Sequence, residues 1–166
     1  ENALSSYLAL QNAKSSITGK AREVVNLVVS QVNECEYCLA AHTVIGGMVG
    51  FNEAQILEIR NGKASFDKKL DALAQLTKSI AANRGKANPL LVEAFFAAGW
   101  TKENLVDTIV TIGDKTVTNY LHKNSQRNGQ EWRRRISRRR QPTHQETHHG
   151  YQEQRCFHHG CQSRHW

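Results

Sequence analysis

The sequence predicts an all-α protein, a compact helical domain of about six or seven helices, and three observations support this prediction. Apolar residues recur three and four positions apart along most of the chain, which is the spacing of one face of an α-helix. No stretch alternates apolar and polar residues for long, so we expect no strands. Asparagine, threonine, glycine and proline separate the periodic segments at the positions that helix caps prefer. A chain of 166 residues is also long enough to bury one core.

Three helices are expected in the first part of the chain. Residues 3–13 form a short amphipathic segment, and a second helix follows Thr18. The apolar stripe of this second helix consists of Ala21, Val24, Val25, Val28 and Val32. The third helix is expected from near Asn33 to about Val49, where Gly50 ends it.

The next two helices are indicated by their ends. Asn52 can cap the first of them, because the side chain of Gln55 can reach back and close a capping box. Gly62 ends that helix. The other covers residues 67–84 and stops before Gly85, with leucines on one face.

The last two helices of the domain begin near Asn88 and Thr101. Asn88 followed by Pro89 is a good pair of N-cap and first-turn residues. Thr101 caps the final helix, which we expect to run to about His122.

The composition changes sharply after residue 123. We therefore expect a helical domain at residues 1–123 and an unstructured Arg- and His-rich tail at residues 124–166. The domain holds 13 Lys and Arg against 12 Asp and Glu, whereas the tail holds 9 Arg against 3 Glu. The net charge of +7 is thus mainly a property of the tail. The tail contains no Leu, Val, Ala or Met, so it cannot pack a core.

Three interpretations of the tail compete. Its sequence RRRISRRR, Arg133–Arg140, is typical of a phosphate-binding arm, so nucleic acid is an expected partner only if the tail is genuine. Its histidines, with Cys156 and Cys161, form a candidate metal site. The favoured interpretation is that the tail is an unselected, out-of-frame readthrough.

Nothing in the chain predicts a membrane protein. No apolar run approaches the roughly 18 residues that a membrane span needs. No charged-then-apolar leader opens the chain. We therefore expect a soluble, cytoplasmic protein with no membrane partner.

The segment ECEYCLAAH places two cysteines and a histidine on one face of the third helix. Cys35, Cys38 and His42 stand at positions i, i+3 and i+7, which a helix advancing 100° per residue brings within about 60° of one another. Ile45 and Val49 continue the same stripe. We therefore expect this face to point into the protein rather than into water.

Three interpretations of this motif are open. A structural zinc site needs four ligands, and the domain supplies only these three side chains and the distant His122. Two buried structural thiols beside a core histidine would be a coincidence, and CxxCxxxH at a helix start is not common. Redox chemistry is favoured, because the positive end of a helix favours thiolate over thiol. His42 stands one turn after Cys38 and can take its proton.

A further acid would complete a proton relay, and Glu23 is the candidate. It lies on the preceding helix, which is largely apolar on the side that it buries. The alternative is an ordinary first-turn acid on a helix that opens at Gly19, where negative charge is favoured in any case. The residues alone support both interpretations about equally.

Two stretches of the domain resemble a known family. The stretch REVVNLVVSQVNECEYCLAAHTVIGGMVGF, Arg22–Phe51, contains Glu, eleven intervening residues, CxxC, three residues and His. The stretch AAGWTKENLVDTIVTIGDKTVTNYLH, Ala97–His122, is similar to that family's closing helix. Together they resemble the alkylhydroperoxidase D-like group of the carboxymuconolactone decarboxylase superfamily. The resemblance covers nearly all of the domain and none of the tail.

The resemblance implies a thiol-dependent hydroperoxide reductase with Glu23, Cys35, Cys38 and His42 as catalytic residues. By that analogy Cys38 attacks the peroxide, Cys35 resolves the sulfenic acid to a disulfide, and His42 with Glu23 draws off the proton. No bound cofactor or metal is implied, and an external dithiol reductant protein of the lipoyl or thioredoxin type restores the pair. Family members assemble as homotrimers or homohexamers. Tyr37 stands where some members have a histidine, which argues against a close match to the lipoyl-dependent peroxidases.

Two alternatives remain within the same fold. One is lactone or carboxylate chemistry like that of carboxymuconolactone decarboxylase, a branch that does not depend on a CxxC pair. The other is a module for dithiol–disulfide exchange or redox sensing that uses the same cysteines without peroxide.

Overall fold

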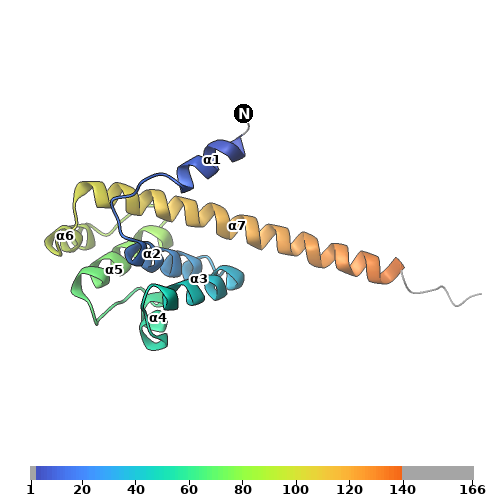
Figure 1. Cartoon of the computed structure of the whole chain (residues 1–166), viewed down its shortest axis with the longest axis horizontal. Helices are drawn as coiled ribbons and strands as arrows, with labels where there is room; N and C mark the ends of the chain where they lie inside the picture. Colours follow the sequence, from blue (N-terminus) through green and yellow to red (C-terminus); the bar gives the residue numbers. More distant parts are fainter. Residues whose placement is uncertain (1–2, 140–166) are drawn as a thin grey trace, which may run out of the picture.

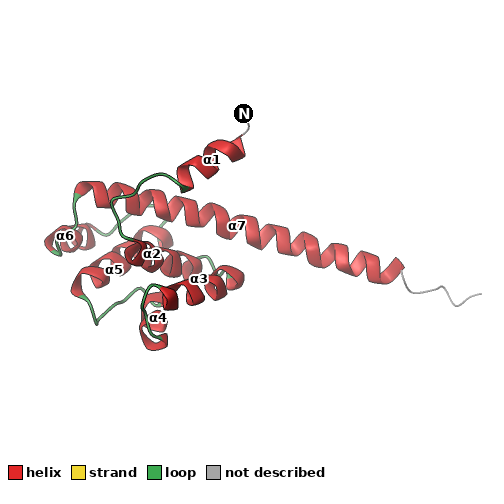
Figure 2. Cartoon of the chain, in the orientation of Figure 1, coloured by secondary structure: helices red, strands yellow, loops and turns green. Residues whose placement is uncertain are grey.

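The part of the chain that the computed structural model describes is helical throughout, apart from short connections (Figure 2). It comprises residues 3–139, with side chains described for residue 3 and residues 5–125. Its helices are α1 (Ala3–Gln11), α2 (Gly19–Val32), α3 (Glu36–Met48), α4 (Glu53–Arg60), α5 (Lys68–Ala82), α6 (Pro89–Ala97) and α7 (Lys102–Arg139). The predicted all-α fold and the predicted number of helices are confirmed.

Helix α2 lies at the centre of the fold, where α3, α4, α5 and α7 pack against it. Its apolar side chains Val24, Val25, Leu27, Val28 and Val29 are completely buried. A helix that is apolar around most of its circumference is stable only when other elements surround it. Helix α7 runs along one side of this bundle and continues beyond it (Figure 1).

The helix starts follow the predicted caps. The hydroxyl of Thr18 accepts a hydrogen bond from the first turn of α2. Asn52 and Gln55 form the complete capping box of α4, with bonds of 2.9 and 3.0 Å. Asn88 caps α6 from the position before Pro89. Such caps are local interactions, which explains why the sequence alone predicts them.

The last helix is longer than predicted. Helix α7 passes His122, where we expected it to end, and continues to Arg139. The stretch of residues 124–139 is rich in Arg, which favours helices, and the next proline after it is Pro142. The lack of apolar residues limits core packing, but it does not prevent a helix from continuing. The prediction of a domain boundary at 123 stays a prediction.

The remaining predictions about the tail concern residues 140–166, which lie outside the described part of the chain. This range contains Cys156 and Cys161, and the side chains of Arg133–Arg140 are likewise not described.

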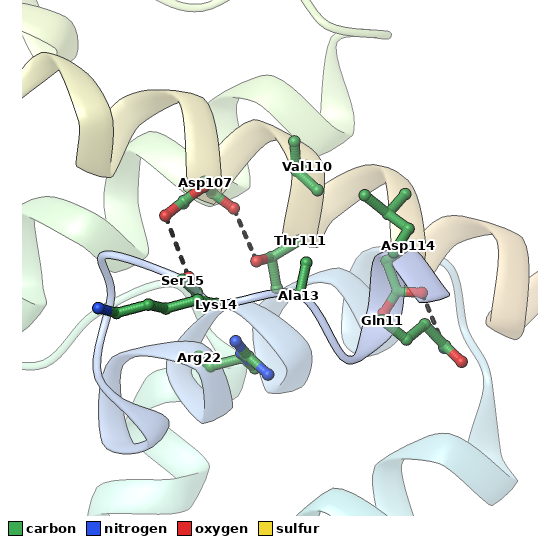
Figure 3. A pocket seen from close by; sticks show the side chains of 10 residues that line it. Gln11, Ala13, Lys14, Ser15, Arg22, Asp107, Val110, Thr111 and Asp114 are labelled. Atoms are coloured by element: carbon green, nitrogen blue, oxygen red, sulfur yellow. Dashed lines mark hydrogen bonds between the residues drawn. The ribbon is translucent and has the colours of Figure 1, made fainter. Parts of the chain in front are cut away.

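Helix α1 is attached to α7 through two carboxylates (Figure 3). The hydroxyl of Tyr7 and the amide of Gln11 both donate to Asp114, the amide at 2.9 Å. After α1 ends, the hydroxyl of Ser15 donates to Asp107 at 3.2 Å. These contacts border a pocket of about 140 Å³ between α1, α2 and α7. No described helix is both long enough and apolar enough to cross a membrane.

Candidate functional site

The connection between α2 and α3 places both cysteines at the start of α3. Glu34 adopts a left-handed backbone conformation with φ of 52°, and the chain then turns into the helix. The N–H of Cys35 donates to the carbonyl of Ser30 at 3.0 Å, which fixes the turn. Cys35 is therefore the N-cap residue of α3, two positions later than the helix start that we expected at Asn33. Cys38 lies in the first turn.

Cys35 and Cys38 form a disulfide that is buried under the surrounding helices. Their Cα atoms are 5.3 Å apart, and their exposed fractions are 2% and 4%. The side chain of Cys35 makes no capping hydrogen bond at the start of α3. The free N–H groups and the dipole of this first turn favour negative charge on a sulfur released there.

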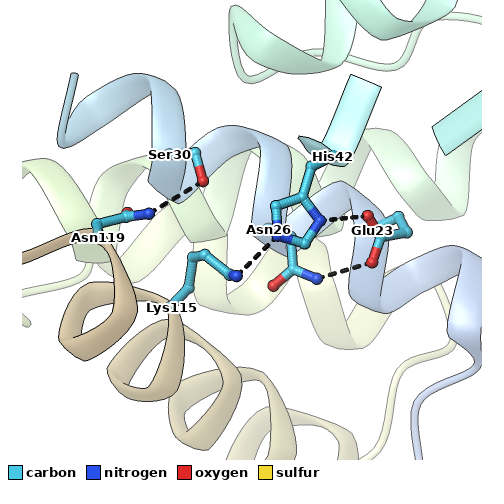
Figure 4. Close-up of polar contacts among 6 residues, drawn as sticks. All are labelled: Glu23, Asn26, Ser30, His42, Lys115 and Asn119. Carbon is cyan, nitrogen blue, oxygen red and sulfur yellow. Dashed lines mark hydrogen bonds and ion pairs between the residues drawn. The ribbon is translucent and has the colours of Figure 1, made fainter. Parts of the chain in front are cut away.

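His42 and Glu23 lie in direct contact, although 19 positions separate them (Figure 4). Nδ1 of His42 is 2.7 Å from Oε2 of Glu23. Oε1 of Glu23 also accepts a hydrogen bond of 2.8 Å from the amide of Asn26. An ionised carboxylate can only accept hydrogen bonds, so Nδ1 of His42 carries the proton that fills this contact.

Glu23 is a buried acid and not a first-turn acid. Helix α2 begins at Gly19, which places Glu23 beyond the first turn, and its exposed fraction is 6%. A buried carboxylate needs hydrogen-bonding partners, and His42 and Asn26 supply them. Of the two interpretations that the sequence left open, the structure thus supports the one in which Glu23 faces the motif of α3.

Lys115 is a functional candidate that the sequence analysis missed. Its Nζ is 2.7 Å from Nε2 of His42, and its exposed fraction is only 9% (Figure 4). Burial lowers the pKa of Lys115 below its ordinary value, and the nearby charges of Asp114 and Glu23 partly oppose this effect. The sequence did contain a signal for it: Lys115 stands two helical turns after Thr108, so it lies on the same, buried side of the helix.

Lys115 belongs to a polar stripe on α7, which consists of Lys115, Asn119 and Lys123. Asn119 is completely buried and donates to the hydroxyl of Ser30 at 3.3 Å. It also accepts a 3.0 Å hydrogen bond from the amide of Asn33. Lys123 donates to the carbonyl of Asn33 at 3.0 Å. The stripe therefore attaches α7 to the end of α2, directly before the cysteines.

Tyr37, which stands between the two cysteines in the sequence, contacts His122. Tyr37 is exposed to 55% and its ring lies 4.4 Å from the ring of His122, centroid to centroid. His122 was the fourth side chain considered for zinc, and it faces this aromatic ring. Within the described part of the chain, no three His, Cys, Asp or Glu residues are arranged to hold a metal ion.

The fold and the site together define a helical protein with a disulfide-bonded cysteine pair at a helix start. Residues 2–79 match the model of the carboxymuconolactone decarboxylase family. This match contains Glu23, Cys35, Cys38 and His42. The family resemblance predicted from the sequence is confirmed.

Two solved structures share the fold. One is a protein of unknown function from Agrobacterium tumefaciens, provisionally named as the antioxidant defence protein AhpD. Its TM-score is 0.66 and its sequence identity 20%, and the match covers 74% of this chain and 87% of the Agrobacterium chain. The other is an uncharacterized peroxidase-related protein from Silicibacter, with a TM-score of 0.62 and 18% sequence identity. This match covers 73% of this chain and 66% of the Silicibacter chain. At these identities the likeness concerns the fold alone. No curated protein matches the sequence.

Proposed function

We propose that this protein is a thiol-dependent hydroperoxide reductase, an oxidoreductase with peroxide as its acceptor. The observation that carries the proposal is the pairing of the Cys35–Cys38 disulfide with the His42–Glu23 contact one helical turn away. A cysteine pair that closes and opens can store two electrons, and an adjacent histidine–carboxylate pair can move the accompanying proton.

The proposed cycle begins with the reduced pair. Cys38 gives up its S–H proton towards His42 and Glu23, and the thiolate attacks the terminal oxygen of the hydroperoxide. The S–O bond forms, the O–O bond breaks, and the leaving alkoxide takes up a proton to become the alcohol. Cys38 is now a sulfenic acid.

The second half of the cycle closes the disulfide and then reopens it. The Cys35 thiol attacks the Cys38 sulfur and releases water, which produces the disulfide state of this structure. An external dithiol then reduces the disulfide by thiol exchange and leaves as its own disulfide. The sum is hydroperoxide plus dithiol giving alcohol, water and an oxidised dithiol, with no bound cofactor.

The reductant and the assembly are part of the proposal. We expect a dithiol protein of the lipoyl or thioredoxin type, acting in the cytoplasm, where thiol pools are kept reduced. A homotrimer or homohexamer is supported by apolar side chains on the outer faces of α3 and α7. The exposed residues are Val44, Ile45, Met48, Val106, Ile109, Val110, Val117, Tyr120 and Leu121. The mass of the particle in solution tests this assembly.

The test of the reaction uses a background without Cys156 and Cys161, both replaced by serine, so that only the paired cysteines remain. Peroxide consumption with a small dithiol is measured for this protein and for its Cys38→Ser and Cys35→Ser variants. We expect Cys38→Ser to consume no peroxide above the uncatalysed rate. Cys35→Ser should stop after one turnover with a sulfenic acid that a dimedone-type reagent labels. Full activity in both variants would overturn the proposal.

A dithiol–disulfide exchange module is the second candidate, and the same disulfide favours it. Reduction of the oxidised protein by a dithiol is followed alongside oxidation of the reduced protein by peroxide. Fast exchange with negligible peroxide oxidation would select the exchange module. Turnover of a carboxylated lactone by the Cys35→Ser/Cys38→Ser double variant would instead select decarboxylase chemistry.

A further inference from the structure

Both ring nitrogens of His42 are occupied in the disulfide state, and this limits how the ring can take a proton. Nδ1 faces Glu23 and Nε2 faces Lys115, each at 2.7 Å (Figure 4). Two N–H groups cannot point at each other over 2.7 Å. Nζ of Lys115 and Nε2 of His42 therefore hold one proton in the contact between them.

That proton belongs mainly to Lys115. An amine is ordinarily several pKa units more basic than an imidazole. Burial lowers the pKa of Lys115 and therefore makes this difference smaller. His42 is then the neutral tautomer with its proton on Nδ1, donating to Glu23, while Nε2 accepts from the ammonium.

The surroundings of Lys115 show what its charge balances. His42 on α3 contacts its Nζ, and the charges of Asp114, its neighbour on α7, and of Glu23 on α2 act on it. Asp114 is already used by the hydroxyl of Tyr7 on α1. The ammonium of Lys115 and the buried carboxylate of Glu23 thus lie on opposite sides of the imidazole ring, and the positive charge balances the negative one.

Packing alone does not explain a lysine at this position. Removing a charged ammonium from water is costly, and a methionine would fill similar volume without that cost. The hydrogen-bonding partner of its Nζ is an imidazole nitrogen rather than a carboxylate. The feature is therefore better explained by proton transfer at His42 than by stability.

We propose that Lys115 is a positioning residue of the proton relay, which holds Nε2 of His42 and shares with it the proton that passes from Cys38 to the alkoxide. This inference rests on the proposed peroxidase function. In the reaction the S–H bond breaks and the S–O bond forms, the O–O bond breaks, and the alcohol O–H bond forms. The Lys115 ammonium first gives its proton through Nε2 of His42 to the alkoxide. The resulting amine then takes up a proton in place of the one that Cys38 released, so the charge of the pair is the same before and after.

The first test compares Lys115→Met, Lys115→Arg and a matched control, Lys123→Met, in the peroxide assay. Lys123 lies on the same stripe of α7 but contacts the Asn33 carbonyl and not His42. We expect Lys115→Met to lower kcat/KM about tenfold or more, a smaller effect than the roughly 10²–10⁴-fold that a directly acting acid–base group contributes. Lys123→Met should retain the wild-type rate, and Lys115→Arg, which keeps a cation, should recover part of it.

The pH profile separates this role from a structural one. The relay needs the ammonium, so the wild-type rate should fall as pH rises through the titration of Lys115, whose pKa is lowered from 10.5. Arginine does not titrate in this range, so Lys115→Arg should lose this alkaline decline. A Lys115→Met variant with wild-type kcat/KM and an unchanged alkaline decline would overturn the inference.

A second readout does not need activity. In the ¹⁵N spectrum of the disulfide form, assigned with a His42→Gln variant, we expect His42 to carry its proton on Nδ1 and none on Nε2. Lys115→Met should shift the Nε2 signal towards a protonated nitrogen, and Lys123→Met should not. A wild-type spectrum with a proton on Nε2 would refute the Lys115–His42 arrangement. If this spectrum is as expected but the wild type consumes no peroxide, the peroxidase function and the relay role fail while the contact stands.

Discussion

Helix α7 carries two polar networks that differ in their surroundings. On one side Asp107 and Asp114 accept hydrogen bonds from α1 and from the segment that follows it, at the edge of the fold (Figure 3). On the other side Lys115 and Asn119 reach His42 and Ser30 in the interior (Figure 4). Asp114 and Lys115 are adjacent in sequence, yet they serve different networks because successive residues of a helix point about 100° apart.

The difference teaches how one helix can combine attachment and chemistry. In the outer network, neutral groups donate hydrogen bonds to carboxylates that water also reaches. Each of these hydrogen bonds therefore contributes modestly to stability. The inner network has a cation, an imidazole and a carboxylate in a row with little water, where each partner controls the protonation of the next. We therefore expect changes in the outer network to affect mainly the attachment of α1, and changes in the inner one to affect the site.

The largest expected effect is the loss of activity in Glu23→Gln. The amide keeps the size of the side chain but removes the negative charge that stabilises a proton on His42, so kcat/KM for peroxide should fall about 10²-fold. Asp107→Asn removes a carboxylate from the outer network and is the matched control, with an unchanged rate expected. Equal losses in the two variants would show that the networks do not differ in function.

The next effect is on stability. Asn119→Ala leaves the Ser30 hydroxyl and the Asn33 amide without their buried partner, which should lower the free energy of unfolding by about 1–3 kcal/mol. Asp114→Ala in the half-buried outer network should cost about 1 kcal/mol or less. Urea unfolding at one fixed protein concentration measures both. A larger loss in Asp114→Ala would reverse the proposed ranking.

The smallest effect is a change in the titration of Tyr7. Burial, then the hydrogen bond to Asp114 and its charge, raise the pKa of Tyr7 from 10.0 to about 12. Because the folded value lies above the unfolded one, the neutral phenol stabilises the fold fully below pH 10, and this contribution is lost between about pH 10 and 12. In Asp114→Asn the phenolate absorbance should appear at lower pH. Tyr7→Phe identifies the signal, and an unmoved titration would contradict the role of Asp114.

The sequence predicted those parts of the fold that depend on neighbouring residues. The capping box of Asn52 and Gln55 and the start of α6 at Pro89 involve contacts within four positions, so their pattern is visible in the chain. The length of α7 was missed because the prediction gave the scarcity of apolar residues after His122 more weight than the helix propensity of the arginines there.

The candidate site was predictable only in part. The positions of Cys35, Cys38 and His42 on α3 follow from their spacing, whereas Lys115 meets His42 across 73 positions, through the packing of α7 on α2 and α3. The same limit applies to Ile45, expected to face the interior but exposed to 38%. Whether a helix face is buried depends on which other helices pack against it, and a single sequence does not show which helices those are.

The N-cap position of Cys35 links the oxidation state of the protein to the stability of one helix end. While the disulfide is closed, the sulfur of Cys35 is bonded to Cys38 and the N–H groups of the first turn of α3 have no side-chain acceptor. Reduction frees that sulfur at the N-cap position, the position that side-chain acceptors of first-turn N–H groups prefer. In the proposed cycle a reductant therefore acts at a helix terminus as well as on a bond.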